Sequence, residues 1–74
     1  MSNRHPKLTA KALIKILEKK GFRFSRQNGS HAVYINDDGQ RTTVPMHGKK
    51  ELGIGLLKQI MNDTGLTIGD LGEN

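Results

Sequence analysis

The sequence predicts an α+β domain in which helices cover one face of a three-stranded antiparallel sheet. Three observations predict this class: apolar residues at helical spacing near both ends, alternating or β-branched segments between them, and glycine-containing turns in the middle. The predicted order is α-β-β-β-α, and helices on one side of such a sheet are typical of the class. With 74 residues there is room for one domain. We expect a flexible tail over 1–7, the domain over 8–71 and a frayed end over 72–74.

The first predicted helix covers Ala10–Lys20. Thr9 is a suitable N-cap, because its side-chain oxygen can accept from a backbone N–H of the first turn. Leu8 and Leu13 occupy the two positions of a hydrophobic staple across that cap, and Gly21 is a natural stop. The apolar residues that predict its core-facing side are Ala10, Leu13, Ile14, Ile16 and Leu17.

A stripe of lysines runs along the same helix. Lys7, Lys11, Lys15 and Lys19 recur every four residues, which places them along one slowly drifting line on a helix. Such a stripe either faces the phosphates of a nucleic acid or forms a solvated face, because like charges at this spacing repel only weakly in water. The spacing agrees with both interpretations.

Three strands are predicted between the helices, from period-two alternation and β-branched residues. The segments are Phe22–Arg26, Ser30–Ile35 and Arg41–Val44. Asn28-Gly29 is a strong hairpin signal, because a type I′ turn needs positive φ at both of its central positions. The sequence Asp37-Asp38-Gly39 predicts the second turn, so the strands form an antiparallel meander.

Alternation also assigns side chains of the second strand to two faces. It groups His31 with Val33 and Ile35, and Ala32 with Tyr34. Taken strictly, this points His31 toward the core, although its place at the start of the strand can leave the ring in solvent. Tyr34 then either stacks on a base from the open face of the sheet or packs across the strands.

A second helix is predicted near the carboxyl end, stopping near Gly65. Its apolar positions are Ile54, Leu57, Ile60 and Met61. Gly53 and Gly55 indicate a late start. Thr67 and Asp70, three residues apart, predict a short capped turn after it.

The chain has a formal net charge of +5 and an isoelectric point of about 9.9. Residues 1–26 hold eight Lys or Arg and one acid, whereas residues 27–74 hold four Lys or Arg and six acids. A cationic half favours polyanions through counterion release, so nucleic acid is the expected partner. The alternative is that this charge only confers solubility.

The absence of cysteine excludes disulfides and thiolate zinc sites, and it suits a reducing cytosol. The polar first seven residues do not predict a secretory signal, and no apolar run approaches membrane-spanning length. We therefore expect a cytoplasmic protein with no membrane partner.

Histidine is the residue type best suited to chemistry here. An imidazole titrates near pH 6.5, so it both accepts and gives protons at neutral pH. Metal-free cleavage of RNA needs a base for the 2′-hydroxyl, an acid for the 5′-oxygen and positive charge around phosphorus. The carboxylates are scattered along the chain, whereas two-metal catalysis needs them clustered, so we expect no metal and no cofactor.

Several motifs in order resemble the HicA family of mRNA interferase toxins from bacteria and archaea. They are Glu18-Lys19-Lys20-Gly21-Phe22, Gly29-Ser30-His31, Val44-Pro45-Met46-His47, Lys50-Glu51-Leu52 and Gly55-Leu56-Leu57-Lys58-Gln59-Ile60. The resemblance runs from about Leu8 to Leu71. It implies a fold similar to double-stranded-RNA-binding domains, an mRNA substrate and a HicB-type antitoxin that silences the toxin by direct contact.

The resemblance also implies that His31 is the catalytic histidine. His47 then donates the second proton, holds a phosphate or stabilises its loop. The expected RNA-binding residues are Gly29, Ser30, Lys11, Lys15, Lys19, Lys49 and Lys50. The alternative for Gly29 is that it serves only as the turn glycine. The alternative for Lys49 and Lys50 is that they are solvated loop residues. The rival functions are a noncatalytic double-stranded-RNA-binding module and an adaptor whose cationic helix binds an acidic protein.

Overall fold

The computed structural model describes residues 7–46 and 49–72. The expected tail apart from Lys7, His47 and the last two residues lie outside this range. The elements are α1 (Ala10–Lys19), β1 (Arg23–Asn28), β2 (His31–Ile35), β3 (Arg41–Pro45), α2 (Ile54–Thr64) and α3 (Ile68–Leu71). The predicted α+β class and element order are confirmed, and α3 forms where a short capped turn was expected.

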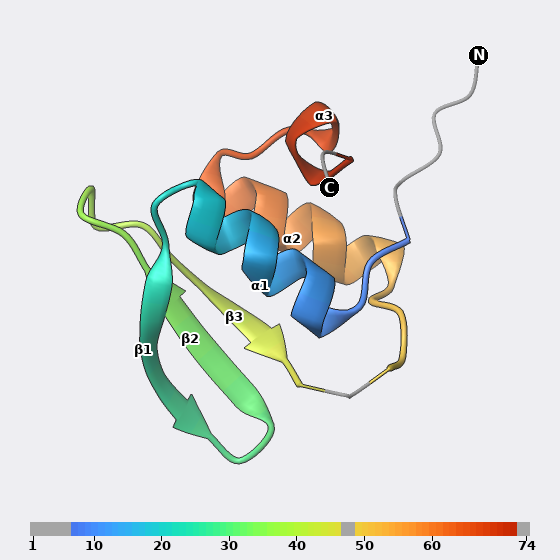
Figure 1. Ribbon diagram of the computed structural model, residues 1–74, viewed down its shortest axis with the longest axis horizontal. Helices are drawn as coiled ribbons and strands as arrows, with labels where there is room; N and C mark the ends of the chain where they lie inside the picture. Colours follow the sequence, from blue (N-terminus) through green and yellow to red (C-terminus); the bar gives the residue numbers. More distant parts are fainter. Residues whose placement is uncertain (1–6, 47–48, 73–74) are drawn as a thin grey trace.

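The three strands form one antiparallel sheet in the order β1-β2-β3, and the helices lie on one side of it (Figure 1). Both α1 and α2 pack against β3, while α3 contacts α1. The helices do not cover β1, whose six residues are all exposed. The sheet is therefore half solvated, as antiparallel sheets commonly are.

Register assigns every strand residue to one of two faces, because residues directly opposite each other share a face. The helix face holds Phe24, Gln27, Ala32, Tyr34, Thr42 and Val44, and the open face holds Arg23, Arg26, Asn28, His31, Val33, Ile35, Arg41, Thr43 and Pro45. On the helix face, Ala32, Tyr34, Thr42 and Val44 are buried, whereas Phe24 and Gln27 of β1 are exposed. The open face carries the catalytic candidate His31, which is exposed.

The strict alternation that points His31 toward the core is therefore wrong, and the alternative that its ring lies in solvent is confirmed. The core face of β2 is formed by Ala32 and Tyr34, while Val33 and Ile35 are only half buried on the other side. Alternation alone does not say which of the two sets of side chains faces the core. The apolar Val33 and Ile35 favoured the set that the structure places on the open face. The helices settle it, because they pack over Val44, which stands opposite Ala32.

The ends of α1 follow the prediction. The backbone N–H of Ala12 donates to Oγ1 of Thr9 at 3.2 Å, and Leu8 and Leu13 are both buried as a hydrophobic staple requires. The chain turns at Gly21, and the N–H of Phe22 donates to the carbonyl of Leu17 at 2.9 Å. Local sequence was sufficient here because both capping signals lie within one helical turn of the ends.

The first hairpin differs from its prediction by one residue. β1 continues through Asn28, which stands opposite His31, so the two loop residues are Gly29 and Ser30. Gly29 has φ of 57°, and no residue other than glycine has positive φ in the described chain. The predicted type I′ turn centred on Asn28-Gly29 is therefore wrong. A glycine with positive φ at the first central position is typical of type II′ turns.

A β-bulge in β1 changes which side chains share a face. Phe24 stands opposite Tyr34, but the next aligned residue is Arg26, which stands opposite Val33. In a regular strand, residues two apart point the same way. The extra residue, Ser25, therefore sends Phe24 to the helix face and Arg26 to the open face, an effect for which bulges are known.

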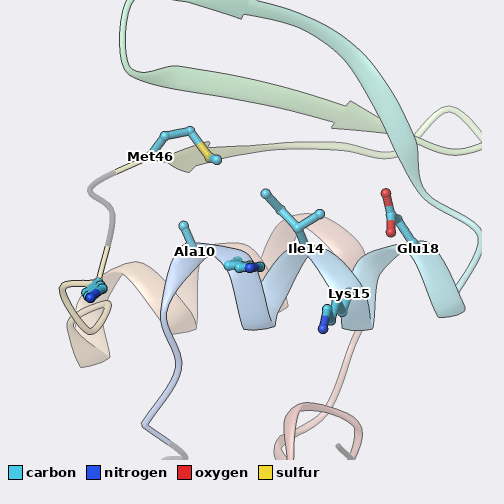
Figure 2. Close-up of a pocket in the computed structure, with 7 residues that line it drawn as sticks. Ala10, Ile14, Lys15, Glu18 and Met46 are labelled. Carbon is cyan, nitrogen blue, oxygen red and sulfur yellow. The ribbon is translucent and has the colours of Figure 1, made fainter.

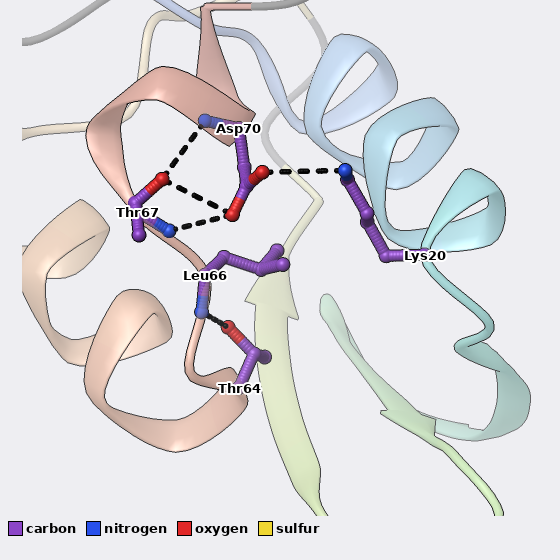
Figure 3. Close-up of polar contacts among 5 residues, drawn as sticks. All are labelled: Lys20, Thr64, Leu66, Thr67 and Asp70. Carbon is purple, nitrogen blue, oxygen red and sulfur yellow. Dashed lines mark hydrogen bonds and ion pairs between the residues drawn. The ribbon is translucent and has the colours of Figure 1, made fainter.

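The carboxyl-terminal helices are joined to the rest by side-chain contacts (Figure 3). Thr67 and Asp70 form a capping box at the start of α3, and Asp70 also pairs with Nζ of Lys20 at 3.2 Å. On α2, Asp63 accepts from the hydroxyl of buried Thr42 at 3.0 Å. The longest helix in residues 7–46 and 49–72 has 11 residues, and none of them is long and apolar enough to cross a membrane.

We predict that Asp70→Asn destabilises the protein at neutral pH and has less effect in acid. The backbone N–H of Thr67, and then Lys20, hold the pKa of Asp70 below its ordinary value. A carboxyl group with a lowered folded-state pKa adds stability above its unfolded pKa, and that contribution is lost as the pH falls through the folded pKa. Denaturant unfolding of both proteins, from pH 7 down through the carboxyl range, measures the difference.

The control for this comparison is Asp38→Asn, which removes an exposed turn carboxylate. A loss for Asp70→Asn that stays the same at every pH would contradict a role for the charge of Asp70.

Gly29→Ala is predicted to destabilise the hairpin by about 1–2 kcal/mol, because a Cβ in the left-handed region clashes with its own backbone. Gly29→Asn should lose less, because asparagine tolerates this region better. Nothing lies within 4 Å of a Cβ built at position 29, so the comparison reports backbone strain alone. Chemical denaturation measures both losses, and equal losses would rule out φ as their cause.

Candidate active site

The candidate active site lies at the end of the sheet where the first hairpin turns. His31 is the first residue of β2 and stands between Asn28 of β1 and Pro45 of β3. The N–H of Met46 donates to the carbonyl of Ser30 at 2.6 Å, which ties β3 to the hairpin loop just beyond His31. Two neighbouring strands therefore hold the backbone of His31 on both sides.

The imidazole of His31 is exposed on the open face. No hydrogen bond joins its ring to any part of the chain that the structure describes, so both ring nitrogens are accessible to a ligand. Gly29 and Ser30 are exposed beside it, and Gly29 has no side chain to obstruct an approaching group. This end of the hairpin thus combines a proton-transfer group with accessible backbone.

Three arginines share the open face with His31, and one of them, Arg26, lies in the row next to it. The register forms three rows across the strands, and the rows are Asn28-His31-Pro45, Arg26-Val33-Thr43 and Arg23-Ile35-Arg41. None of the residues in the three strands is acidic. The open face is therefore cationic along its strands, with half-buried apolar side chains at its centre.

These arginines are not identifiable as site residues from the sequence alone. Arg23 and Arg26 were counted in the cationic half of the chain, but regular alternation would place them on opposite faces. The bulge brings them together, and Arg41 joins them only through the pairing of β3 with β2. No local sequence signal identifies the bulge, so the grouping needed the tertiary structure.

The predicted lysine stripe lies away from His31. Lys11, Lys15 and Lys19 are exposed on α1, which belongs to the helix layer. Figure 2 shows Lys15 projecting away from the strands. The expected RNA-binding lysines of α1 and the catalytic candidate are therefore on opposite sides of the sheet.

An apolar groove of about 540 Å³ separates α1 from the end of β3 (Figure 2). Ala10 and Ile14 of α1 and Met46 form its apolar walls, and Glu18 lies at one end. Its other lining residues are the cations Lys11, Lys15 and Lys49. Lys49 and Lys50 are both exposed in the segment that leads to α2. The groove lies on the helix side and does not include His31.

Tyr34 does not take part in the open face. It is 6% exposed on the helix face, and its ring meets that of Phe24 edge-on with centroids 5.9 Å apart. Burial, and then the nearby charge of Glu18, raise the pKa of Tyr34. Cross-strand packing is therefore confirmed for Tyr34, and stacking on a base from the open face is wrong, because helix packing decides which face is open.

His47, the predicted second catalytic or phosphate-binding residue, lies outside the described residues. Within residues 7–46 and 49–72, no three His, Cys, Asp or Glu side chains gather in a set that could hold a metal ion.

Comparisons with known proteins agree with the resemblance drawn from the motifs. Residues 10–66 match the family described as the HicA toxin of bacterial toxin-antitoxin. A protein of Pseudomonas fluorescens (strain Pf0-1), named a probable mRNA interferase HicA, is 40% identical over 50 residues, which cover 68% of this chain and 82% of that protein. The family match includes α1, the whole sheet and α2, and with them His31. This chain therefore belongs to the HicA toxin family.

Proposed function

We propose that this protein is an endoribonuclease toxin that cleaves mRNA with His31 and is neutralised by a HicB-type antitoxin. The observation that carries the proposal is the exposed His31 ring, held at the hairpin end of a cationic face in a HicA-family chain. The name of the Pseudomonas fluorescens relative, a probable mRNA interferase, supports RNA as the substrate.

The chemistry requires two proton transfers. The 2′-oxygen bonds to phosphorus as the bond to the 5′-oxygen breaks, while a base takes the 2′-hydroxyl proton and an acid protonates the leaving oxygen. His31 serves as one of these groups, because an imidazole carries out either role near neutral pH. His47 or a water molecule supplies the other.

Positive charge lowers the barrier by stabilising the phosphorane-like transition state. The exposed backbone at Gly29 and Ser30 is next to His31, so its N–H groups are candidates to bind the phosphate oxygens. Lys11, Lys15 and Lys19, with Lys49 and Lys50, attract the polyanion from the helix side and the loop. Their contribution is mainly to affinity and encounter rate.

A noncatalytic double-stranded-RNA-binding module is the second candidate function. The exposed stripe of Lys11, Lys15 and Lys19 on α1 favours it, because such a module needs cations and shape but no proton-transfer group. The exposed His31 favours the enzyme instead, since simple binding to a duplex has no need of it.

We predict that His31→Ala lowers the rate of RNA cleavage by 100-fold to 10,000-fold, the usual effect of losing a general acid or base. RNA affinity and the unfolding midpoint should change little, because the side chain is exposed and its ring makes no hydrogen bond within the described residues. Gel analysis of RNA incubated with each protein measures cleavage, and circular dichroism checks the fold.

Asn62→Ala is the matched control, because it truncates an exposed polar side chain on α2. Cleavage by the wild type should also persist in EDTA. Full cleavage by folded His31→Ala would disprove the catalytic role, and a requirement for added magnesium would disprove the metal-free mechanism.

A HicB-type antitoxin is predicted to compete with RNA. A partner that places acidic or apolar residues over His31 and the nearby cationic surface would block access without unfolding the toxin. Titrating the antitoxin into His31→Ala protein bound to fluorescent RNA should release the RNA, and association should slow as salt rises. Simultaneous binding of RNA and antitoxin, without mutual weakening, would rule out occlusion.

A further inference from the structure

We propose that single-stranded RNA lies across the open face of the sheet, where Arg26 next to His31 and Arg41 farther along the same face hold its backbone. This inference rests on the proposed function, because it names the surface and the form of RNA that the endoribonuclease uses. It shifts the main binding contacts from the lysines of α1 to arginines on the opposite side of the molecule.

The first support is position. Arg26 lies in the row next to His31 and diagonal to it, a relation that places the two backbones roughly 7–8 Å apart. Arg41 stands opposite Ile35, four residues along β2 from His31, which is about 13 Å at the usual rise of a strand. The two arginines are on the outer strands, on either side of β2. An extended chain crossing the sheet from His31 would therefore meet both.

The second support is charge. The third arginine of this face, Arg23, is paired with Asp37 at 2.8 Å, so its charge is partly neutralised. Arg26 and Arg41 form no ion pair with any residue that the structure describes, and the strands contain no acid. Guanidinium groups bind phosphate with two parallel hydrogen bonds, which makes arginine well suited to this contact.

The third support is the surface between the arginines. Val33 and Ile35 of β2 are half buried there, and no helix covers them. Unstacked bases can lie on such an apolar strip, whereas the bases of an A-form duplex stay inside the helix and offer mainly phosphates and 2′-hydroxyls. Apolar side chains between cations therefore favour a single strand over a duplex.

The bulge in β1 is the fourth observation that supports this arrangement. It is the irregularity at Ser25 that turns Arg26 from the helix face to the face of His31. Bulges occur frequently next to active sites, where they redirect a side chain. Here the redirected side chain is a cation next to the catalytic candidate.

The test measures binding of a fluorescent, 2′-O-methyl single-stranded RNA to full-length protein carrying His31→Ala. Arg26→Gln and Arg41→Gln are added singly and together, since glutamine keeps a polar stem without charge. Each should weaken binding on the order of tenfold, as expected for losing a charged hydrogen bond. Each should also reduce the slope of log K against log salt by about 0.7. The control Lys58→Gln removes one positive charge from an exposed position on α2, and it should change neither the affinity nor the salt slope.

Two further measurements make the outcome decisive. Arg26→Lys should recover the salt slope but only part of the affinity, because it keeps the charge and loses the two-pronged contact. A duplex of the same sequence should be less sensitive to both arginine changes. The inference is overturned if the arginine variants bind the single strand as the parent does, or if Lys11→Gln with Lys15→Gln abolishes binding while the arginine variants do not.

Failure of the proposed function has a different signature. If wild-type protein does not cleave RNA, or His31→Ala cleaves fully, the catalytic proposal fails even though arginine-dependent binding of the single strand persists. Normal cleavage that depends on His31 but not on Arg26 or Arg41 would instead refute only the inference about the open face.

Discussion

The packing of α1 and α2 against one face of the sheet is the constraint on which the rest of this structure depends. Leu13 and Leu17 of α1, Ile60 of α2 and Val44 of β3 are fully buried. Each buried side chain of this size contributes about 1.5–3 kcal/mol, and a domain of 74 residues has a single core in which to gain it. The side of the sheet that these helices cover decides which strand residues meet solvent, His31 among them.

The helices cover only one face of the sheet and leave β1 exposed. The uncovered face carries His31 and three arginines. The whole of β1 is exposed, and a bulge interrupts this edge strand. Bulges and charged side chains both reduce the tendency of an exposed edge to pair with another chain. In this protein the same bulge also brings Arg26 to the open face, so the edge strand and the candidate site share this irregularity.

Cationic groups occupy both sides of the molecule, and the two sides differ in kind. Lys11 and Lys15 of α1 border an apolar groove on the helix side, whereas the arginines stand on the open face of the sheet with His31. A flexible ammonium attracts a polyanion over distance, and a planar guanidinium fixes a phosphate in place. Net charge alone therefore indicates a polyanionic partner, whereas the positions of the arginines distinguish the side of the sheet that carries the candidate His31.

Local signals in the sequence determined the elements of this protein. Thr9 and Gly21 bound α1, and Thr67 and Asp70 cap α3, because each signal acts within a few residues. The family was identified from several motifs in order along the chain, with Gly29-Ser30-His31 among them. Tertiary structure decided the faces and the exact turn. Alternation divides the side chains of a strand into two sets, but the packing of the helices decides which set is buried. The extra residue in β1 reverses the assignment for the residues that follow it. Only packing and register could therefore place His31 in solvent, bury Tyr34 and bring Arg26 to the face of His31.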